Sequence, residues 1–339
     1  MRYKLFGKSG LRVSELCLGT MTFGEDWGWG ASKEVSRKIF DTFAGAGGNF
    51  IDTAYNYTNG TSEKYVGEFI SSDRDHFVVA TKYSLTLRKE DPNAGGNHRK
   101  NMMRSMNESL KRLNTDYIDL YWLHMWDSTT PVDEVLRAFD DLVRSGKVLH
   151  IGLSDTPAWV VSQANAIAEL RGWSHFVGVQ APYSLADRGV ERELLPMANA
   201  LGLAVTPWGL LEGGELTGKY NKPTDEPKRS NDASPKIKSL AEVVVAMATE
   251  IGRTPSQAAI NWVRQQKQAQ IIPILGARTE AQIKDNLGCL EFDLTDEQWR
   301  RLDEANPISL GFPRSFLESD HVRGLIFGET FNKIDRLKR

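Results

Sequence analysis

Side chains that can donate, accept or stabilise protons follow several short apolar runs of this 339-residue chain. Asp52, Lys82 and His124 each stand at or just after the end of such a run. Further residues at the same position in later runs are Ser154, Asp155, Gln180, Trp208 and Gly276. If the runs are parallel strands of one barrel, their C-terminal ends share a rim, and barrel enzymes carry their active sites there. A carboxylate, an ammonium and an imidazole on one rim indicate acid–base chemistry.

The elements that would position these groups alternate in a regular way. Eight short apolar runs, at residues 16–18, 49–52, 77–81, 118–123, 148–153, 178–180, 204–206 and 271–275, are separated by segments with helical periodicity. This alternation predicts an α/β fold, specifically a (β/α)8 TIM barrel. A doubly wound open sheet would alternate in the same way, but no G-x-G-x-x-G follows the first run.

Several segments lie outside the eight units. Residues 3–13 form an expected N-terminal hairpin around the turn at 8–10, which would close the bottom of the barrel. Two extra helices are expected at 237–251 and 256–265, near strand eight, and further ones near the C-terminus. The polar stretch 221–236 is rich in Pro, Asp, Lys and Ser, which predicts a mobile loop. We see no fixed repeat and no linker, so residues 1–339 are predicted to form a single domain.

Composition limits the kinds of partner. The chain has 42 Lys and Arg against 44 Asp and Glu, and the resulting net charge of −2 argues against nucleic acid or a membrane surface. Cys17 and Cys289 are too few for a disulfide framework, which favours a reducing compartment. No apolar run has membrane-spanning length, and the first residues lack a signal-peptide pattern. We expect a cytoplasmic protein with a small-molecule substrate; its oligomeric state is open.

A series of short motifs runs in order along the chain. They are Asp52-Thr53-Ala54 with Tyr57 and Ser62-Glu63, Thr81-Lys82, Leu123-His124, Gly152-Leu153-Ser154, Val179-Gln180 with Tyr183-Ser184, Leu216-Thr217-Gly218-Lys219, and Gly276-Ala277-Arg278 with Gln282 and Asn286. In these motifs the chain resembles the aldo-keto reductase family. The segments 96–100 and 154–161 resemble its aryl-alcohol dehydrogenase branch.

The resemblance implies a catalytic tetrad of Asp52, Tyr57, Lys82 and His124, with hydride from NADPH to a carbonyl carbon and a proton from Tyr57 to its oxygen. Tyr55 is a nearby competitor, and only the five-residue step from Asp52 selects Tyr57. An ammonium about 4 Å from a phenol, at an effective dielectric constant near 20, shifts its pKa by roughly three units. We therefore expect Lys82 to lower the pKa of Tyr57, and Asp52 to hold Lys82 charged and oriented. His124 would polarise the carbonyl as a neutral donor.

The resemblance also implies an NADP(H) site. Tyr183 would stack on the nicotinamide, while Ser154, Asp155 and Gln180 would bind its carboxamide; Asp155 stands where the family usually has Asn. Other implied contacts are Gly19, Thr20, Met21, Asp52, Trp208, Gly209, Leu210, Leu211, Gly213, Gly218, Lys219, Gly276, Ala277, Arg278, Gln282, Asp285 and Asn286. Glu212 and Glu215 in the glycine-rich loop are expected to point outward.

The 2′-phosphate of NADP is assigned to Arg278 and to the start of the helix that follows it. Thr279 and Gln282 have the spacing of a capping box, and a helix N-terminus attracts anions. A guanidinium suits a phosphate. NADP is therefore expected in preference to NAD.

Aromatic residues flank the expected rim and favour aryl or apolar aldehydes and ketones. Trp27, Trp29 and Trp126 would line the substrate pocket with Tyr57 and His124, and the tail adds Phe312, Phe316 and Phe327. Alternatives are a sugar or polyol oxidoreductase of the same family and a non-catalytic NADP-binding subunit like the β subunits of potassium channels. The six histidines show no ligand cluster, so no metal is expected. The direction of the reaction in the cell is left open.

Overall fold

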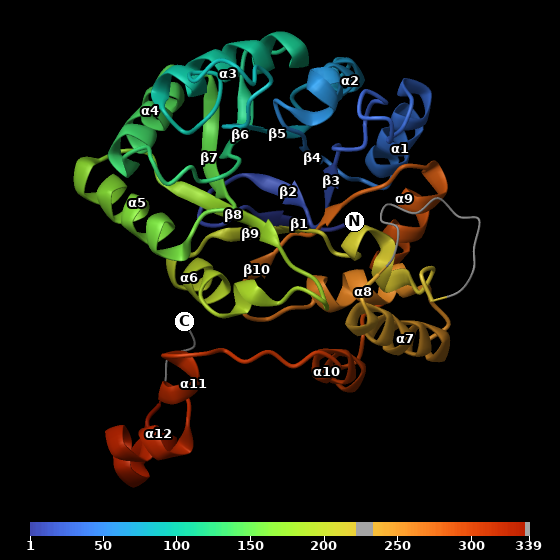
Figure 1. Ribbon diagram of the computed structural model, residues 1–339, viewed down its shortest axis with the longest axis vertical. Helices are drawn as coiled ribbons and strands as arrows, with labels where there is room; N and C mark the ends of the chain where they lie inside the picture. The colour runs from blue at the N-terminus through green and yellow to red at the C-terminus, as the bar shows by residue number, and fades with distance from the viewer. Residues whose placement is uncertain (222–232, 336–339) are drawn as a thin grey trace.

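A closed ring of parallel strands forms the centre of the molecule (Figure 1). The structure, a computed structural model, describes residues 1–221 and 233–335. The ring strands are β3 (Cys17–Gly19), β4 (Phe50–Asp52), β5 (Val78–Tyr83), β6 (Ile118–Leu123), β7 (Val148–Ser154), β8 (Phe176–Pro182), β9 (Ala204–Trp208), β10 (Gln270–Ile271) and β11 (Ile274–Leu275). β10 pairs with β9 and β11 pairs with β3, so the sheet closes on itself. The predicted (β/α)8 barrel is confirmed, with strand limits within two residues for the first seven runs.

The eighth strand differs from the single run expected at 271–275, because it is divided into β10 and β11. Ile272 still donates its amide hydrogen to the carbonyl of Val205 on the β9 side, at 2.8 Å. Pro273 has no amide hydrogen to donate, and its carbonyl accepts from Cys17 on the β3 side, at 2.9 Å. The chain thus changes partner strand at the proline, and this change closes the ring.

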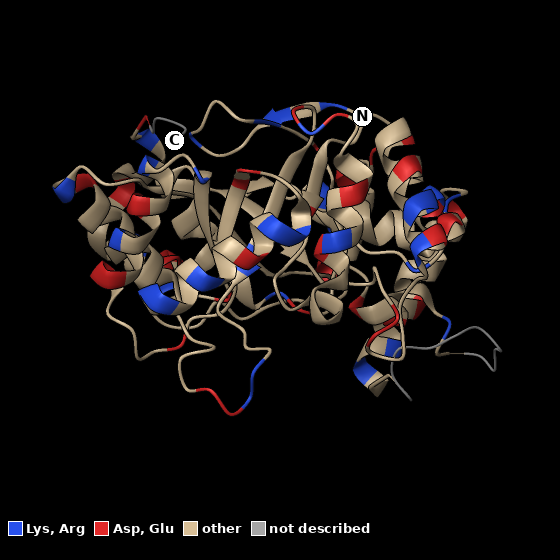
Figure 2. Ribbon diagram, turned by 90° about the horizontal axis from the view of Figure 1, so that it is seen from above, with Lys and Arg blue, Asp and Glu red and all other residues tan. Residues whose placement is uncertain are grey.

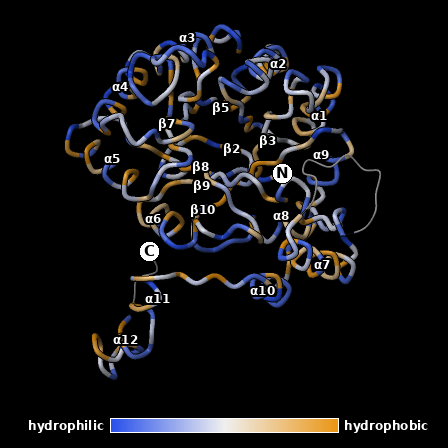
Figure 3. Tube along the Cα trace, viewed as in Figure 1, coloured by the Kyte–Doolittle hydropathy of each residue, from blue (hydrophilic) through white to orange (hydrophobic). Residues whose placement is uncertain are grey.

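Helices surround the ring, with their apolar sides toward the strands (Figure 3). The barrel helices are α1 (Lys33–Gly45), α2 (Thr61–Ile70), α3 (Arg99–Leu113), α4 (Val132–Arg144), α5 (Ala158–Arg171), α6 (Leu194–Leu201) and α9 (Glu280–Leu287). The two extra helices predicted before strand eight are present as α7 (Pro235–Glu250) and α8 (Pro255–Arg264). Most of the predicted loop 221–236 lies outside the described residues.

The N-terminal hairpin covers one end of the barrel, as expected. It consists of β1 (Tyr3–Leu5) and β2 (Arg12–Ser14), and Phe6 in its turn is fully buried. The Phe6 ring meets Phe50 and Trp122 edge to face, with centroids 5.6 and 6.2 Å apart. A Cβ atom at Gly178 would lie 2.6 Å from the Phe6 ring, so this position requires glycine. The hairpin is therefore a plug, because its Phe6 side chain packs directly into the barrel interior.

The C-terminal segment runs along the outside of the barrel through α10 (Asp296–Glu304), α11 (Arg314–Leu317) and α12 (Asp320–Phe327). Arg188 holds its start by donating to the carbonyls of Asp303 and Asn306, at 2.7 and 3.0 Å. Beyond this anchor, α11 and α12 stand away from the barrel (Figure 1), and Phe312 is 85% exposed. The other two aromatic residues named for the tail, Phe316 and Phe327, are 55% and 36% exposed.

Positively and negatively charged residues are mixed along the visible helices, where Lys and Arg alternate with Asp and Glu (Figure 2). None of the helices within 1–221 and 233–335 is long and apolar enough to cross a membrane.

Candidate active site

Four side chains from three successive barrel strands and one loop meet at the C-terminal rim. Asp52 ends β4, Lys82 lies near the end of β5, His124 follows β6, and Tyr57 opens the short 3₁₀ segment η1 (Tyr57–Gly60). Lys82 forms an ion pair with Asp52 and donates to the hydroxyl oxygen of Tyr57, with 3.1 Å between nitrogen and oxygen. Its third partner is the carbonyl of Thr53, at 2.8 Å. The fully buried ammonium thus connects a carboxylate to a phenol.

The loop after β4 explains why Tyr57 occupies the site and Tyr55 does not. The Tyr55 hydroxyl donates to the carboxylate of Glu108 on α3, at 2.8 Å, so it points away from Lys82. Thr58 and Asn59 have left-handed φ angles of 45° and 56°. The Thr58 hydroxyl donates to the Phe23 carbonyl at 2.6 Å. These contacts reverse the chain after Tyr57 and direct its ring toward Lys82.

Burial changes the expected ionisation of Tyr57. Desolvation raises the pKa of its phenol, and although Lys82 lowers it, the result is a pKa above the ordinary value near 10.0. Lys82 thus lowers the pKa of Tyr57 as expected, but burial raises it by more, so the net shift is upward and not downward. Burial also disfavours the Lys82 ammonium, but Asp52 and Tyr57 outweigh it and the pKa of Lys82 is raised. The site thus holds a charged lysine against a protonated tyrosine.

His124 completes the rim beside the tyrosine. Its ring meets that of Tyr57 edge to face, with centroids 5.8 Å apart. Burial, together with the charge of Lys82, holds the pKa of His124 well below its usual value. The imidazole is therefore neutral at physiological pH, in agreement with the expected neutral donor. Its Nδ1 atom is enclosed and has no hydrogen-bond partner among the described residues.

Polar residues at the ends of the next strands adjoin the four. Gln180 on β8 donates to the second carboxylate oxygen of Asp52 at 3.1 Å and to Thr206 at 3.4 Å. Ser154 ends β7, and Asp155 follows it with a left-handed φ of 43°. The Ser154 hydroxyl and one Asp155 carboxylate oxygen are enclosed without a hydrogen-bond partner in residues 1–221 and 233–335. The rim therefore presents buried polar atoms that a bound molecule could satisfy.

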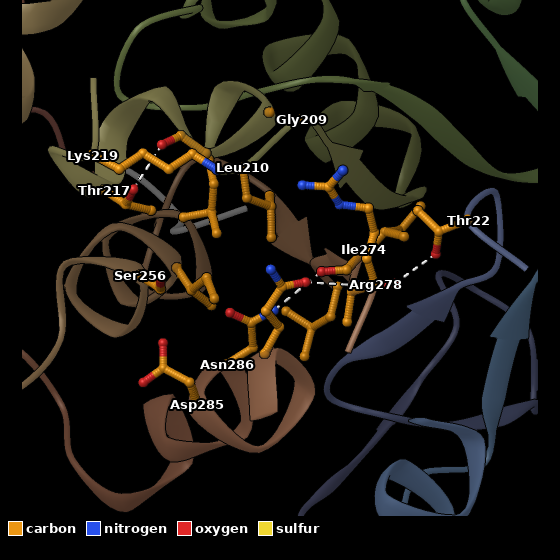
Figure 4. Close-up of a pocket in the computed structure, with 18 of the residues that line it drawn as sticks. Thr22, Gly209, Leu210, Thr217, Lys219, Ser256, Ile274, Arg278, Asp285 and Asn286 are labelled. Atoms are coloured by element: carbon orange, nitrogen blue, oxygen red, sulfur yellow. Dashed lines mark hydrogen bonds between the residues drawn. The ribbon is translucent and has the colours of Figure 1, made fainter. Parts of the chain in front are cut away.

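A groove of about 330 Å³ lies between the loop after β9 and the start of α9 (Figure 4). None of Asp52, Tyr57, Lys82 and His124 is part of its lining. Most cofactor contacts implied by the sequence line it, namely Gly209, Leu210, Leu211, Gly213, Lys219, Gly276, Ala277, Arg278, Gln282, Asp285 and Asn286. Gly214, which the glycine-rich loop also offered for the pyrophosphate, lines the groove as well. The sequence reasoning missed Thr22, Thr217, Ser256, Ile260, Ile274 and Leu275. Thr22 directly follows Met21, which was an expected contact, and the Thr22 hydroxyl donates to the Ala277 carbonyl at 2.6 Å. Ser256 lies on α8, and no sequence motif would have identified it.

The start of α9 is built somewhat differently from the expected capping box. Thr279 accepts a hydrogen bond from the Gln282 amide at 3.2 Å, as predicted. The Gln282 side chain, however, accepts from the backbone of Arg278 at 2.8 Å, one residue before the expected partner. Asn286 donates to the Gly276 carbonyl at 3.2 Å. The connection from β11 to α9 is thereby fixed at the end of the groove.

Tyr183 and Trp208, two aromatic residues of the expected cofactor site, differ in their exposure. Tyr183 is 1% exposed, and its hydroxyl donates to Glu191 at 2.9 Å and accepts from Gln266 at 2.6 Å. Its ring is therefore in the interior and cannot stack on a ligand in the groove, which corrects the expectation for Tyr183. Trp208, at the end of β9, is 41% exposed and directly precedes Gly209 of the groove wall.

Other expected contacts also differ in detail. The Thr20 side chain is buried and donates to the Asp52 carbonyl at 3.0 Å, so it supports the strand end from below. Gly19, Met21 and Gly218 do not line the groove within the described part of the chain. Glu212 does not point outward as expected, because it is half-buried and accepts from Ser184 at 2.5 Å. Neither Glu212 nor Glu215 lines the groove.

The expected substrate tryptophans divide into two groups. Trp27 lies beside Tyr57, with ring centroids 6.4 Å apart, and its indole donates to Asn59 at 3.4 Å. Trp29 packs against Trp27 at 5.7 Å and also lines the groove. Trp126 is half-buried in the loop after His124. Trp27 and Trp29 thus connect the tyrosine to the groove.

Comparison with known proteins agrees with this geometry. The model of the Aldo/keto reductase family matches residues 15–307. The chain belongs to this family. It is 38% identical to norsolorinic acid reductase of Aspergillus flavus, over 92% of this chain and 83% of the relative. It is 37% identical to aryl-alcohol dehydrogenase [NADP(+)] of Phanerodontia chrysosporium, over 90% of this chain and 85% of that protein. This aldo/keto reductase is therefore an oxidoreductase of the aryl-alcohol dehydrogenase-like branch.

Proposed function

We propose that the protein reduces aldehydes or ketones to alcohols with NADPH, reversibly, and that Tyr57 is the general acid. The observation that carries this proposal is the contact from Lys82 to both Asp52 and the Tyr57 hydroxyl, at the C-terminal rim of the barrel. A carboxylate–ammonium–phenol chain gives a tyrosine a charged partner that stabilises its phenolate as the proton leaves.

The groove and the rim fit a nicotinamide dinucleotide. The nicotinamide would lie between Trp208 and Tyr57, with its carboxamide on the unpaired oxygens of Ser154 and Asp155. The pyrophosphate would pass Gly209 and Gly213, where left-handed backbone lets the chain approach closely. When bound, this cofactor supplies the hydride.

The protein's own residues handle the proton and the carbonyl oxygen. Neutral His124 would donate a hydrogen bond to that oxygen and orient it toward Tyr57. Tyr57 would then give up its proton to the oxygen, and the Lys82 ammonium would stabilise the resulting phenolate. Asp52, held by Gln180 on one oxygen, keeps the ammonium charged and in place.

The preference for NADP rests on Arg278 and on the name of a relative. Arg278 lines the far end of the groove, next to the N-terminus of α9. A guanidinium and a helix N-terminus both favour a 2′-phosphate. The printed name of the Phanerodontia chrysosporium relative includes NADP(+).

Aryl carbonyl compounds are the substrate class that the surroundings favour. Trp27 stands edge to face with Tyr57, so an aromatic group could pack against it while its carbonyl reaches the phenol. The relatives are named for an aryl alcohol and for norsolorinic acid. A sugar substrate remains the second candidate, and the same rim could serve it.

The test compares the Tyr57→Phe and Tyr55→Phe variants in NADPH consumption with 4-nitrobenzaldehyde, other aldehydes, ketones and sugars. We expect Tyr57→Phe to lose turnover by about 100-fold or more, because the proton donor is removed. Tyr55→Phe should keep it, since that hydroxyl donates to Glu108 and not into the site. Wild-type turnover in Tyr57→Phe would overturn the proposal. NADPH binding without turnover of any substrate would favour a regulatory subunit.

A further inference from the structure

Asp155 is an acidic residue in the neutral carboxamide-binding part of the site. It follows β7, and its backbone is fixed on both sides: its amide donates to the Gln180 carbonyl at 3.1 Å, and its carbonyl accepts from Trp126 at 3.4 Å. One carboxylate oxygen is enclosed and has no hydrogen-bond partner among residues 1–221 and 233–335. Asp155 therefore lies on the same rim as Lys82 and Tyr57, next to Ser154 of the proposed carboxamide site.

The charge of Asp155 reaches the reacting groups. Burial is the largest influence on the pKa of Tyr57, and the charge of Asp155 is among the smaller ones that raise it. Burial also raises the pKa of Asp155 itself from its ordinary value near 3.8, while Trp208, Lys82 and Ser154 favour its carboxylate form. The two oxidation states of a nicotinamide differ in charge, because the oxidised ring is cationic and the reduced ring is neutral. A carboxylate beside the ring therefore changes the binding affinity of the oxidised cofactor and of the reduced cofactor by different amounts.

We propose that Asp155 makes this enzyme select the oxidised cofactor: its carboxylate stabilises the cationic nicotinamide of NADP⁺ and gives no such stabilisation to NADPH. This inference rests on the proposed NADP(H) site. Even about 10 Å apart, two unit charges at an effective dielectric constant near 20 interact strongly enough to change a binding ratio roughly tenfold. Asp155 thus acts on the balance between oxidised and reduced cofactor, in addition to any hydrogen bond with the carboxamide.

The test measures Kd for NADP⁺ and for NADPH separately, by fluorescence titration at about pH 8, in wild type and in Asp155→Asn. Asn has the same shape and also tolerates the left-handed φ of 43°. We expect the ratio of Kd for NADP⁺ to Kd for NADPH to rise about tenfold in Asp155→Asn. Any hydrogen bond gained or lost with the carboxamide changes both constants together and so cancels in the ratio.

Two further variants make the outcome decisive. Asp116→Asn removes the same charge from an exposed position before β6, outside the groove lining, so its ratio should stay at the wild-type value. Asp155→Gly also lacks the charge and removes the backbone strain, so it should reproduce the raised ratio if Asp155→Asn folds poorly. A ratio within about twofold of wild type in both Asp155 variants would overturn the inference. Failure of wild type to bind either cofactor form would instead contradict the proposed function.

Discussion

At the scale of single residues, burial and pairing together set the behaviour of the rim. Lys82 is fully buried, and a lone ammonium there would be strongly disfavoured. It remains charged because Asp52 and Tyr57 both face it. The same burial keeps the proton on Tyr57 and keeps His124 neutral. The site is thus prepared in the protonation states that carbonyl reduction requires.

Replacing Lys82 with Met should damage both stability and turnover. Without the ammonium, Asp52 would stay buried with no cation, and we expect the free energy of unfolding to fall by about 3–5 kcal/mol. Turnover should fall by roughly 100-fold or more because the Tyr57 phenolate loses its partner. Urea unfolding and NADPH consumption measure the two effects.

The double variant Lys82→Met with Asp52→Asn separates these effects. It removes the buried carboxylate charge as well, so stability should largely return while turnover stays low. A Lys82→Met protein as stable as wild type would show that the buried ion pair does not have the assigned role.

The raised pKa of Tyr57 sets the expected pH dependence. The phenol stays protonated through neutral pH, so the rate of carbonyl reduction should be level there and fall only as the pH rises through the raised pKa. Alcohol oxidation needs the phenolate as base, and its rate should rise with pH over the same range. Steady-state profiles of kcat in both directions test this, and a reduction rate that increases toward alkaline pH would contradict it.

At the scale of elements, the ends of neighbouring strands position the polar side chains of the rim. The connection from β11 to α9 positions Arg278. Arg278 stands between the strand and the helix, where Gln282 accepts its amide hydrogen. Thr22, in the loop after β3, joins the same connection through the Ala277 carbonyl. Loops from the first and the last strand of the ring therefore hold the far end of the groove together.

Arg278→Ala tests the role of this connection in cofactor choice. We expect Kd for NADPH to increase roughly tenfold to 100-fold, because a charged hydrogen bond to the 2′-phosphate is lost. Kd for NADH, which lacks that phosphate, should change little. Arg300→Ala on α10 removes a guanidinium that pairs with Glu297 and Glu304 and should leave both values unchanged. Equal weakening of NADPH and NADH by Arg278→Ala would refute the assignment.

At the scale of the whole molecule, the hairpin closes one end of the barrel and the candidate active site lies at the other. Phe6 fills the closed end against Phe50 and Trp122, and glycine at position 178 leaves room for its ring. The strands pass from this apolar plug to the polar rim. The apolar packing of the hairpin and the polar groups of the candidate site therefore lie at opposite ends of the same strands.

Replacing Phe6 with Ala should lower stability without lowering turnover. We expect the free energy of unfolding to fall by about 3–5 kcal/mol, because a buried ring is replaced by a cavity. Leu5→Ala, in the same hairpin but 52% exposed, should change it by less than about 0.5 kcal/mol. Turnover per folded molecule should remain near wild type in both, measured below the unfolding transition. Equal stability of the two variants would show that the plug contributes little.

Local sequence pattern was sufficient to predict the barrel and its helices. The run at 118–123 was predicted to the residue as β6, because it is apolar except for Asp119. The division of the last strand was not predicted, since it depends on which neighbours lie on each side of Pro273. The two-way capping box at α9 was half right: Thr279 accepts from the Gln282 amide as its spacing predicts, but the Gln282 side chain accepts from Arg278 and not from Thr279.

The sequence by itself determined the fold class, the order of the strand ends and the family, because periodicity and motif order are properties of the chain. Only the tertiary structure decided that Trp208 is exposed and Tyr183 buried, since both are aromatic residues near strand ends and differ in what surrounds them. It also decided the direction of the Tyr57 pKa shift. A pKa depends on burial as well as on neighbouring charge, and the depth to which a side chain is buried is fixed by packing from many distant segments.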